Sequence, residues 1–158
     1  MYKKIAFFHG LESPVISDKT EFLEQFDAWC PAMDYYDPKL FDKILNELID
    51  RDIDLLIGSS MGGWFAYCLS TLTGIPTLLF NPALNQRSFS PKTFRGNYET
   101  QHTLVLGIFD NVIDSDGTED WLDSNKVEDY DVYFEMMGHR TPINIFSKWV
   151  NKIINEKS

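Results

Sequence analysis

Short apolar runs alternate along the chain with longer stretches in which apolar residues recur every three or four positions. The short runs predict buried strands, and the longer stretches are typical of helices with one face against a core. The predicted strands occupy residues 4–8, 28–33, 53–57, 75–80, 103–109 and 132–136, and the predicted helices occupy a stretch ending near residue 26 and residues 38–49, 61–73 and 142–154. This alternation predicts an α/β protein, a three-layer sandwich in which helices cover both faces of a mainly parallel six-stranded sheet.

Three details refine this pattern. The second strand contains Pro31, which has no N–H for strand pairing, so we place this strand at an edge of the sheet. The helix after Asp37-Pro38 carries an apolar stripe that extends to Ile49, and we expect the whole stripe to lie in the core. The first helix should be capped by Ser17 or Asp18, and Gly74 should end the third.

Length and charge limit the possible functions. The 158 residues fit one domain, residues 1–158, that can bury a sizeable core. The net charge of −10 argues against nucleic acids and anionic membranes as partners. The N-terminal apolar run is too short for a signal peptide, and no run has the length of a membrane span, so we expect a cytoplasmic protein. Cys30 and Cys68 lack metal or redox spacing and are interpreted as buried thiols.

The segment Gly58-Ser59-Ser60-Met61-Gly62 carries the candidate chemistry, because it stands between a predicted strand and a predicted helix. A Gly-x-Ser-x-Gly sequence in this context is typical of a nucleophile elbow, in which the glycines let strand and helix approach closely. Ser60 is then the candidate nucleophile, and the helix that begins at Met61 directs its N-terminal N–H groups toward an oxyanion. The alternative is a glycine-serine loop without chemistry.

Two further residues complete a possible catalytic triad. Asp110 follows the fifth predicted strand and His139 follows the sixth, so both lie at the carboxyl ends of the parallel strands, as Ser60 does. Ligands bind at these strand ends in sheets of this kind. The chain order Ser, Asp, His is the one expected for a triad on such a sheet. Asp114 and Asp116 compete with Asp110 for the role of the acid. Each residue alone has an ordinary interpretation, since an aspartate after a strand can cap a helix and a histidine can be half-buried in a turn.

Over its whole length the chain resembles an α/β-hydrolase, in a minimal form without the first two strands and without a large cap. The similarity lies in the triad order, the elbow, His9-Gly10-Leu11 followed by Ser13-Pro14, Ser17 and Lys19, and Asn81-Pro82-Ala83, and these segments resemble the small bacterial YqiA-like esterases. The resemblance implies an oxyanion hole made by the backbone N–H groups of Leu11 and Met61. For His9 the favoured role is structural, with its side chain satisfying loop backbone groups.

Residues 85–101 are rich in Ser, Pro, Asn, Arg and Thr, with Phe89, Phe94 and Tyr98 between them. We interpret this segment as a substrate-side flap, and the alternative is a compact surface loop that packs its own aromatic rings. The candidate substrate contacts are His9, Gly10, Asn81, Phe89 and Phe94. The acidic residues at 114–131 lack the spacing of a calcium loop, and we expect no metal site and no cofactor.

The sequence thus predicts a serine esterase for small carboxylic esters or thioesters. In this prediction Ser60 forms the acyl-enzyme, His139 acts as base and acid, and Asp110 orients the imidazole. The second hypothesis is a non-catalytic binding protein that uses the same cleft. Without a large cap the cleft should be shallow and favour short acyl chains.

Overall fold

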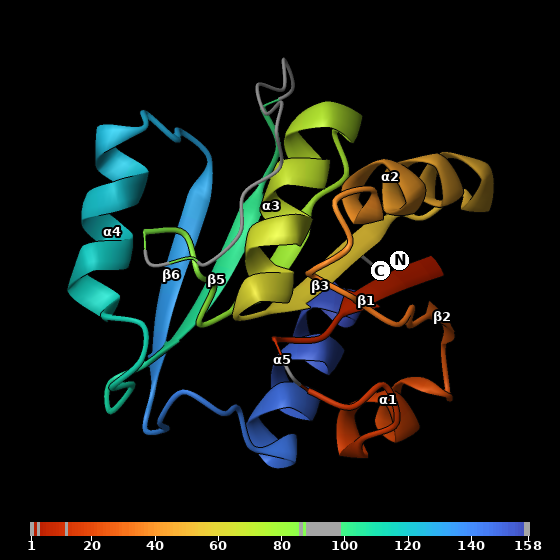
Figure 1. Ribbon diagram of the computed structural model, residues 1–158. Helices are drawn as coiled ribbons and strands as arrows, with labels where there is room; N and C mark the ends of the chain where they lie inside the picture. Colours follow the sequence, from red (N-terminus) through yellow and green to blue (C-terminus); the bar gives the residue numbers. More distant parts are fainter. Residues whose placement is uncertain (1, 3, 12, 86, 88–98, 157–158) are drawn as a thin grey trace.

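The computed structural model describes residues 2, 4–11, 13–85, 87 and 99–156, and a six-stranded sheet runs through the centre of this part of the protein (Figure 1). The strands are β1 (Lys4–Phe8), β2 (Asp27–Trp29), β3 (Leu55–Ser59), β4 (Thr77–Phe80), β5 (His102–Gly107) and β6 (Tyr130–Glu135). Their order across the sheet is β2-β1-β3-β4-β5-β6, and every neighbouring pair is parallel. The predicted α/β fold is therefore confirmed, and the described sheet is wholly parallel.

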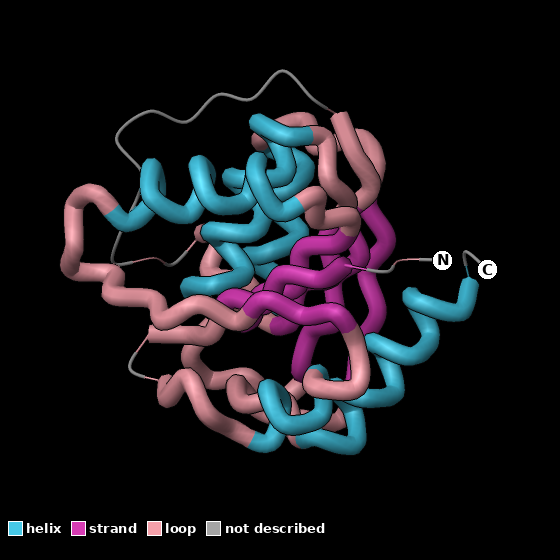
Figure 2. Tube along the Cα trace, turned by 90° about the vertical axis from the view of Figure 1, so that its right-hand side faces the viewer, coloured by secondary structure: helices cyan, strands magenta, loops and turns pink. Residues whose placement is uncertain are grey.

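Helices cover both faces of the sheet, and Figure 2 shows them above and below the strands. They are α1 (Asp18–Leu23), α2 (Leu40–Arg51), α3 (Met61–Thr73), α4 (Ser115–Ser124) and α5 (Ile143–Glu156). Helices α2, α3 and α4 pack on one face, and α1 and α5 pack on the other. Successive strand residues serve opposite faces, so Phe8 lies in the core beneath α2–α4 and Phe7 in the core beneath α1 and α5.

The edge strand β2 is shorter than predicted. It pairs with β1 alone, through residues 27–29, and the chain has left the sheet before it reaches Pro31. The edge position is confirmed, but the predicted extent, residues 28–33, is wrong. Pairing stops ahead of the proline, whose backbone has no N–H to donate to a neighbouring strand.

Helix α2 buries a narrower stripe than predicted. Leu40, Ile44 and Leu48 are each at most 6% exposed, whereas Ile49 is 66% exposed. Residues four positions apart project from the same side of a helix, but the residue after Leu48 is rotated by about 100° from it. The prediction that Ile49 belongs to the core is therefore wrong.

Helix α3 lies in the middle of the core, and its residues 61–71 are all buried. It ends, as predicted, at Gly74, whose φ of 74° lies in the left-handed region that glycine adopts readily. Helix α1 begins after Ser17, one of its two predicted caps, which exchanges capping hydrogen bonds with Thr20; the other candidate, Asp18, is the first residue of the helix. It ends at Leu23 rather than near residue 26.

Strand β5 ends earlier than predicted, and this shifts Asp110 relative to the sheet. Pairing stops at Gly107, where the chain turns and the N–H of Asp110 donates to the Gly107 carbonyl (3.2 Å). Gly107 lies so close to the segment after β6 that a Cβ atom on it would be 2.5 Å from the carbonyl oxygen of Met137. Residues 108–109, predicted as strand, therefore form an exposed turn that carries Asp110 beyond the end of the sheet.

Candidate active site

Ser60 occupies a strained turn between β3 and α3. Its backbone angles, φ 54° and ψ −117°, lie outside the regions that L-residues prefer. The turn is closed by contacts that only glycine allows. A Cβ atom on Gly58 would lie 2.3 Å from the carbonyl oxygen of Gly62, and one on Gly62 would lie 2.0 Å from that of Phe8. The segment thus folds as the strand, tight turn and helix that the sequence predicts.

Hydrogen bonds hold the backbone of Ser60 from several sides. Its N–H donates to the carbonyl oxygen of Phe80 (3.0 Å), and its own carbonyl oxygen accepts from the N–H groups of Trp64 (3.2 Å) and Ala83 (2.9 Å). These contacts tie the turn to the end of β4 and to the first turn of α3. The residue itself lines a cavity at the carboxyl end of the sheet.

Three side chains from three strand ends form a continuous chain of hydrogen bonds. Nε2 of His139 lies 3.0 Å from Oγ of Ser60, and Nδ1 of His139 lies 2.9 Å from Oδ2 of Asp110. A carboxylate acceptor keeps the ring hydrogen on Nδ1, which leaves Nε2 free to accept the hydroxyl proton. The Asp110 side chain is 1% exposed and that of His139 is 22% exposed, so the acid is shielded from water while the imidazole reaches the site.

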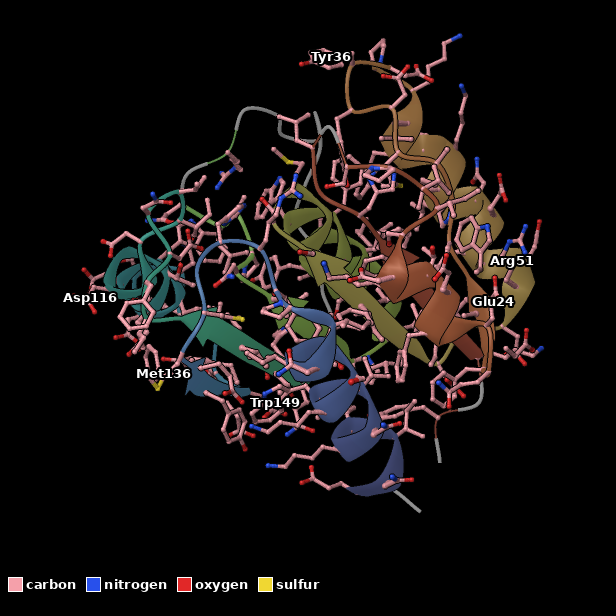
Figure 3. The ribbon with its side chains drawn as sticks, turned by 90° about the horizontal axis from the view of Figure 1, so that it is seen from below. Glu24, Tyr36, Arg51, Asp116, Met136 and Trp149 are labelled. Atoms are coloured by element: carbon pink, nitrogen blue, oxygen red, sulfur yellow. The ribbon has the colours of Figure 1, made fainter. Side chains whose placement is uncertain are left out.

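The structure separates the three candidate acids. Only Asp110 bonds to His139, and its Oδ1 also accepts from the N–H groups of residues 112–113, at 2.8 and 2.9 Å. Asp114 instead caps helix α4, where its side chain accepts a backbone hydrogen bond of 3.2 Å. Asp116 is exposed in the first turn of α4 and lies at the outer rim of the molecule (Figure 3).

Asn81 lies directly after β4, is 2% exposed and ties the strand ends together. Its Nδ2 donates to the carbonyl oxygens of Gly138 (3.1 Å) and His139 (2.9 Å), and its Oδ1 accepts from the N–H of Gly107 (2.7 Å). The residue does not line the cavity, and its hydrogen bonds support the histidine loop. The substrate contact expected of Asn81 stays a prediction. Its φ of 42° suits asparagine, which tolerates the left-handed region better than most residues.

His9 anchors the loop after β1. Its Nδ1 lies 2.8 Å from the carbonyl oxygen of Gly10 and its Nε2 accepts from the N–H of Met33 (3.1 Å), so the hydrogen-bond pattern assigns a neutral ring with its hydrogen on Nδ1. The hydroxyl of Tyr35 donates to the His9 carbonyl oxygen. Both ring nitrogens therefore hold the loop, which is the structural role favoured from the sequence.

The hydrogen-bonded triad opens into a cavity of about 290 Å³. Its wall combines the loop after β1 (residues 9–11, 13 and 14), the start of α1 (residues 17–19), the elbow and residues 139–140. The predicted contacts His9 and Gly10 lie in this wall. Phe89 and Phe94, with most of the predicted flap at residues 85–101, lie outside the described residues.

Lys19 and Arg140 also line the cavity, and sequence reasoning assigned neither of them to the site. In the sequence, Lys19 is one of the residues that resemble the YqiA-like esterases, but it was given no role in the site. A signal for Arg140 was available, since it directly follows the candidate histidine.

Three titratable side chains away from the triad have pKa values shifted by burial. His102 lies at the opposite end of the sheet, its Nδ1 2.9 Å from Oγ1 of Thr77, and burial lowers its pKa to about 4. Burial raises the pKa of the Cys30 thiol to about 11 and that of the Cys68 thiol still further.

Within the described part of the chain, no group of three or more His, Cys, Asp or Glu side chains is arranged to hold a metal ion. None of the helices described has both the length and the apolar character needed to cross a membrane.

Solved structures share this fold. An α/β hydrolase from the metagenome of lagoon sediments at Mar Chica, Morocco, is 16% identical over 99% of this chain and 92% of its own, with a TM-score of 0.76. The monoacylglycerol lipase of Paleococcus ferrophilus is 12% identical over 98% and 95% of the two chains, with a TM-score of 0.71. The fluorophosphonate-binding serine hydrolase F of Staphylococcus aureus is 15% identical over 97% and 82%, with a TM-score of 0.66. At such identities the likeness establishes the α/β-hydrolase fold.

Sequence comparison places the chain in a family. No curated protein matches it. The sequence model of the uncharacterised protein family UPF0227 matches residues 4–112, which include the elbow and Asp110 but end before His139. The predicted resemblance to the YqiA-like branch of the α/β-hydrolases is confirmed by this match and by the fold. The chain belongs to the UPF0227 family.

Proposed function

We propose that this member of the UPF0227 family is a serine hydrolase that cleaves small carboxylic esters or thioesters through an acyl-enzyme. The observation that carries the proposal is the unbroken chain of hydrogen bonds from Asp110 through His139 to Ser60, with distances of 2.9 and 3.0 Å. A base within reach of the nucleophile, and an acid within reach of the base, is the arrangement that activates a serine hydroxyl.

The reaction follows from the atoms involved. Nε2 of His139 takes the proton of Ser60 while Oγ attacks the carbonyl carbon of the ester. The imidazolium returns this proton to the leaving oxygen or sulfur as its bond to the acyl carbon breaks. A water molecule then attacks the acyl-enzyme with His139 again as base, which releases the acid and restores the serine. Asp110 holds the hydrogen of Nδ1 and stabilises the imidazolium.

The oxyanion formed in each step needs hydrogen-bond donors, and we assign this role to the backbone N–H groups of Leu11 and Met61. Met61 is the first residue of α3, where N–H groups have no partner within the helix and the helix dipole is positive. Leu11 lines the same cavity as Ser60. The preceding residue, Gly10, brings the loop close, since a Cβ atom on it would lie 3.4 Å from Cβ of Ser60.

The size of the site and the net charge of the protein support a small-molecule substrate. A cavity of about 290 Å³ holds a short acyl or alcohol group. Proteins with this fold include a lipase of monoacylglycerols and a serine hydrolase that binds fluorophosphonates, which supports ester chemistry at a serine. The net charge of −10 supports small molecules over nucleic acids as partners.

Labelling with a fluorophosphonate probe tests the nucleophile, because the probe forms a covalent adduct with an activated serine that mass spectrometry can locate. We expect the adduct on Ser60 in the wild type and none in Ser60→Ala. Ser59→Ala is the matched control, since it removes the neighbouring hydroxyl of the same turn, and it should label normally. Hydrolysis of 4-nitrophenyl butyrate should follow the same pattern.

Two results would contradict the proposal. Labelling and hydrolysis that survive in Ser60→Ala but disappear in Ser59→Ala would move the nucleophile to the other serine. Folded wild-type protein that neither labels nor hydrolyses esters would favour the second hypothesis, a non-catalytic binding protein that uses the same cleft.

A further inference from the structure

The cavity beside Ser60 carries two cationic side chains that the proposed mechanism does not use. Lys19 belongs to the first turn of α1 and Arg140 directly follows His139, and both line the cavity. Asp18 is the one carboxylate that the described residues contribute to this wall. The wall therefore has an excess of positive charge in a protein whose overall net charge is −10.

Neither cation forms an ion pair within the part of the chain that the structure describes. Several cations on the outer surface do form such pairs. Lys43 pairs with Asp37 at 2.6 Å, and Arg51 pairs with a glutamate one helical turn away at 3.1 Å. The positive charges of Lys19 and Arg140 are therefore available to bind an anionic ligand.

Lys19 is held where its charge is poorly solvated. Burial lowers the pKa of its ammonium group, the neighbouring Asp18 raises it, and the charge of Arg140 lowers it again. Its Nζ lies 6.0 Å from the centre of the Phe146 ring of α5, at the outer range of a cation–π interaction. An anion in the cavity would offset both the lost hydration and the repulsion between the two cations.

We propose that this cavity selects esters or thioesters that carry an anionic group, a carboxylate or a phosphate, on the part of the substrate that lies against Lys19 and Arg140. The inference rests on the proposed function, because it names the substrate class of the same site. An arginine fork binds two oxygens of such a group in parallel, and a lysine adds a further charged donor.

Substrate pairs that differ only in charge test this inference. Mono-4-nitrophenyl glutarate and its neutral amide analogue, 4-nitrophenyl glutaramate, place the charge on the acyl side. The esters 4-carboxyphenyl butyrate and 4-carbamoylphenyl butyrate place it on the leaving group. In one of the two pairs, kcat/KM should be about 10-fold higher for the charged member, mainly through a lower KM, as expected for one charge-assisted hydrogen bond. Ser60→Ala protein supplies the background rate.

Two variants and one control locate the effect. Lys19→Met and Arg140→Met should each lower the charged-to-neutral ratio of kcat/KM several-fold toward one. Lys43→Met removes the same charge from the exposed surface of α2 and should keep the wild-type ratio. The ratio is taken within each variant, so a general loss of activity cancels.

A wild-type ratio of one or less in both pairs, or an unchanged ratio in both cavity variants, would overturn the inference. In either case, Ser60-dependent hydrolysis of the neutral esters would leave the proposed function standing.

Calorimetric titration with glutarate tests anion binding without turnover. The wild type and Lys43→Met should bind glutarate, whereas Lys19→Met and Arg140→Met, each shown to be folded by circular dichroism, should bind it several-fold more weakly. Equal binding by all four proteins, or none by the wild type, would overturn the inference. Glutarate binding by a wild-type protein that hydrolyses none of the esters would contradict the proposed function, and it would reduce the inference to anion binding at this cavity.

Discussion

The elbow and the acid loop each present one member of the proposed triad at the end of a parallel strand, but different forces hold them. In the elbow, residues 58–63, backbone segments approach so closely that a Cβ atom on Gly58 or Gly62 would collide with a carbonyl oxygen. In the acid loop, residues 107–114, the N–H groups that follow Asp110 bond to its carboxylate, and much of the loop surface is exposed.

This difference explains why only one of the two regions appears as a motif. A tightly packed backbone tolerates few residue types, so the elbow has glycine two residues before and two residues after Ser60. A loop held by one carboxylate and two backbone N–H groups accepts many sequences, because every residue except proline carries an N–H. The sequence therefore offers Asp110, Asp114 and Asp116 as acids, and the fold brings Asp110 to the histidine.

The largest expected effect comes from the acid loop. Asp110→Asn should lower kcat by about 10⁴-fold, because an amide does not hold the reactive tautomer of His139 or balance the imidazolium. Steady-state kinetics on 4-nitrophenyl butyrate measure the loss, and circular dichroism checks the fold. Asp116→Asn is the matched control and should keep normal turnover, since that side chain is exposed on α4. Near-normal turnover in Asp110→Asn with a collapse in Asp114→Asn would move the acid to Asp114.

In the elbow, the expected effect is on folding. Gly62→Ala would place a Cβ atom 2.0 Å from the backbone oxygen of Phe8, a residue that is paired with Gly58 in the sheet. We expect a loss of about 3 kcal/mol or more in the free energy of unfolding, measured with urea. The control is Gly138→Ala, whose Cβ atom would have its nearest neighbour at 3.8 Å and should change stability by less than about 1 kcal/mol. Equal losses in the two variants would show that close backbone packing does not hold the elbow.

Asn81 joins the two regions, because it bonds to Gly107 at one end of the acid loop and to the histidine loop. Asn81→Ala should lower the free energy of unfolding by about 2–3 kcal/mol, since it leaves buried backbone groups without partners. It should also lower kcat, as His139 loses its support. Asn144→Ala, at an exposed position of α5, is the control for both measurements. Wild-type stability in Asn81→Ala would contradict the structural role.

The smallest effect is expected at the far end of the acid loop. Asp114→Ala removes the N-cap of α4 and should lower the free energy of unfolding by about 1 kcal/mol, with turnover near that of the wild type. Asp114→Asn should change neither property, because asparagine caps a helix as well as aspartate does. Thermal unfolding and ester hydrolysis measure the two properties. If Asp114→Asn lost turnover, Asp114 would have a role beyond capping.

The sequence by itself determined the class of fold and the form of the elbow. Alternating apolar runs and helical stripes predict the parallel sheet, and Ser17 and Gly74 mark helix ends because their preferences act on the adjacent backbone. The glycines around Ser60 likewise predict the tight turn of the elbow. In each case the relevant contacts join residues close together in the chain or follow from a repeating pattern.

Only the tertiary structure decided which aspartate meets His139, where β5 ends, and that Asn81 supports the site from behind. It also brought Lys19 and Arg140 to one cavity. Each of these outcomes depends on a distance between segments far apart in the chain. Such distances are set by how helices pack on the sheet and how loops leave it, and local residue preferences do not specify them.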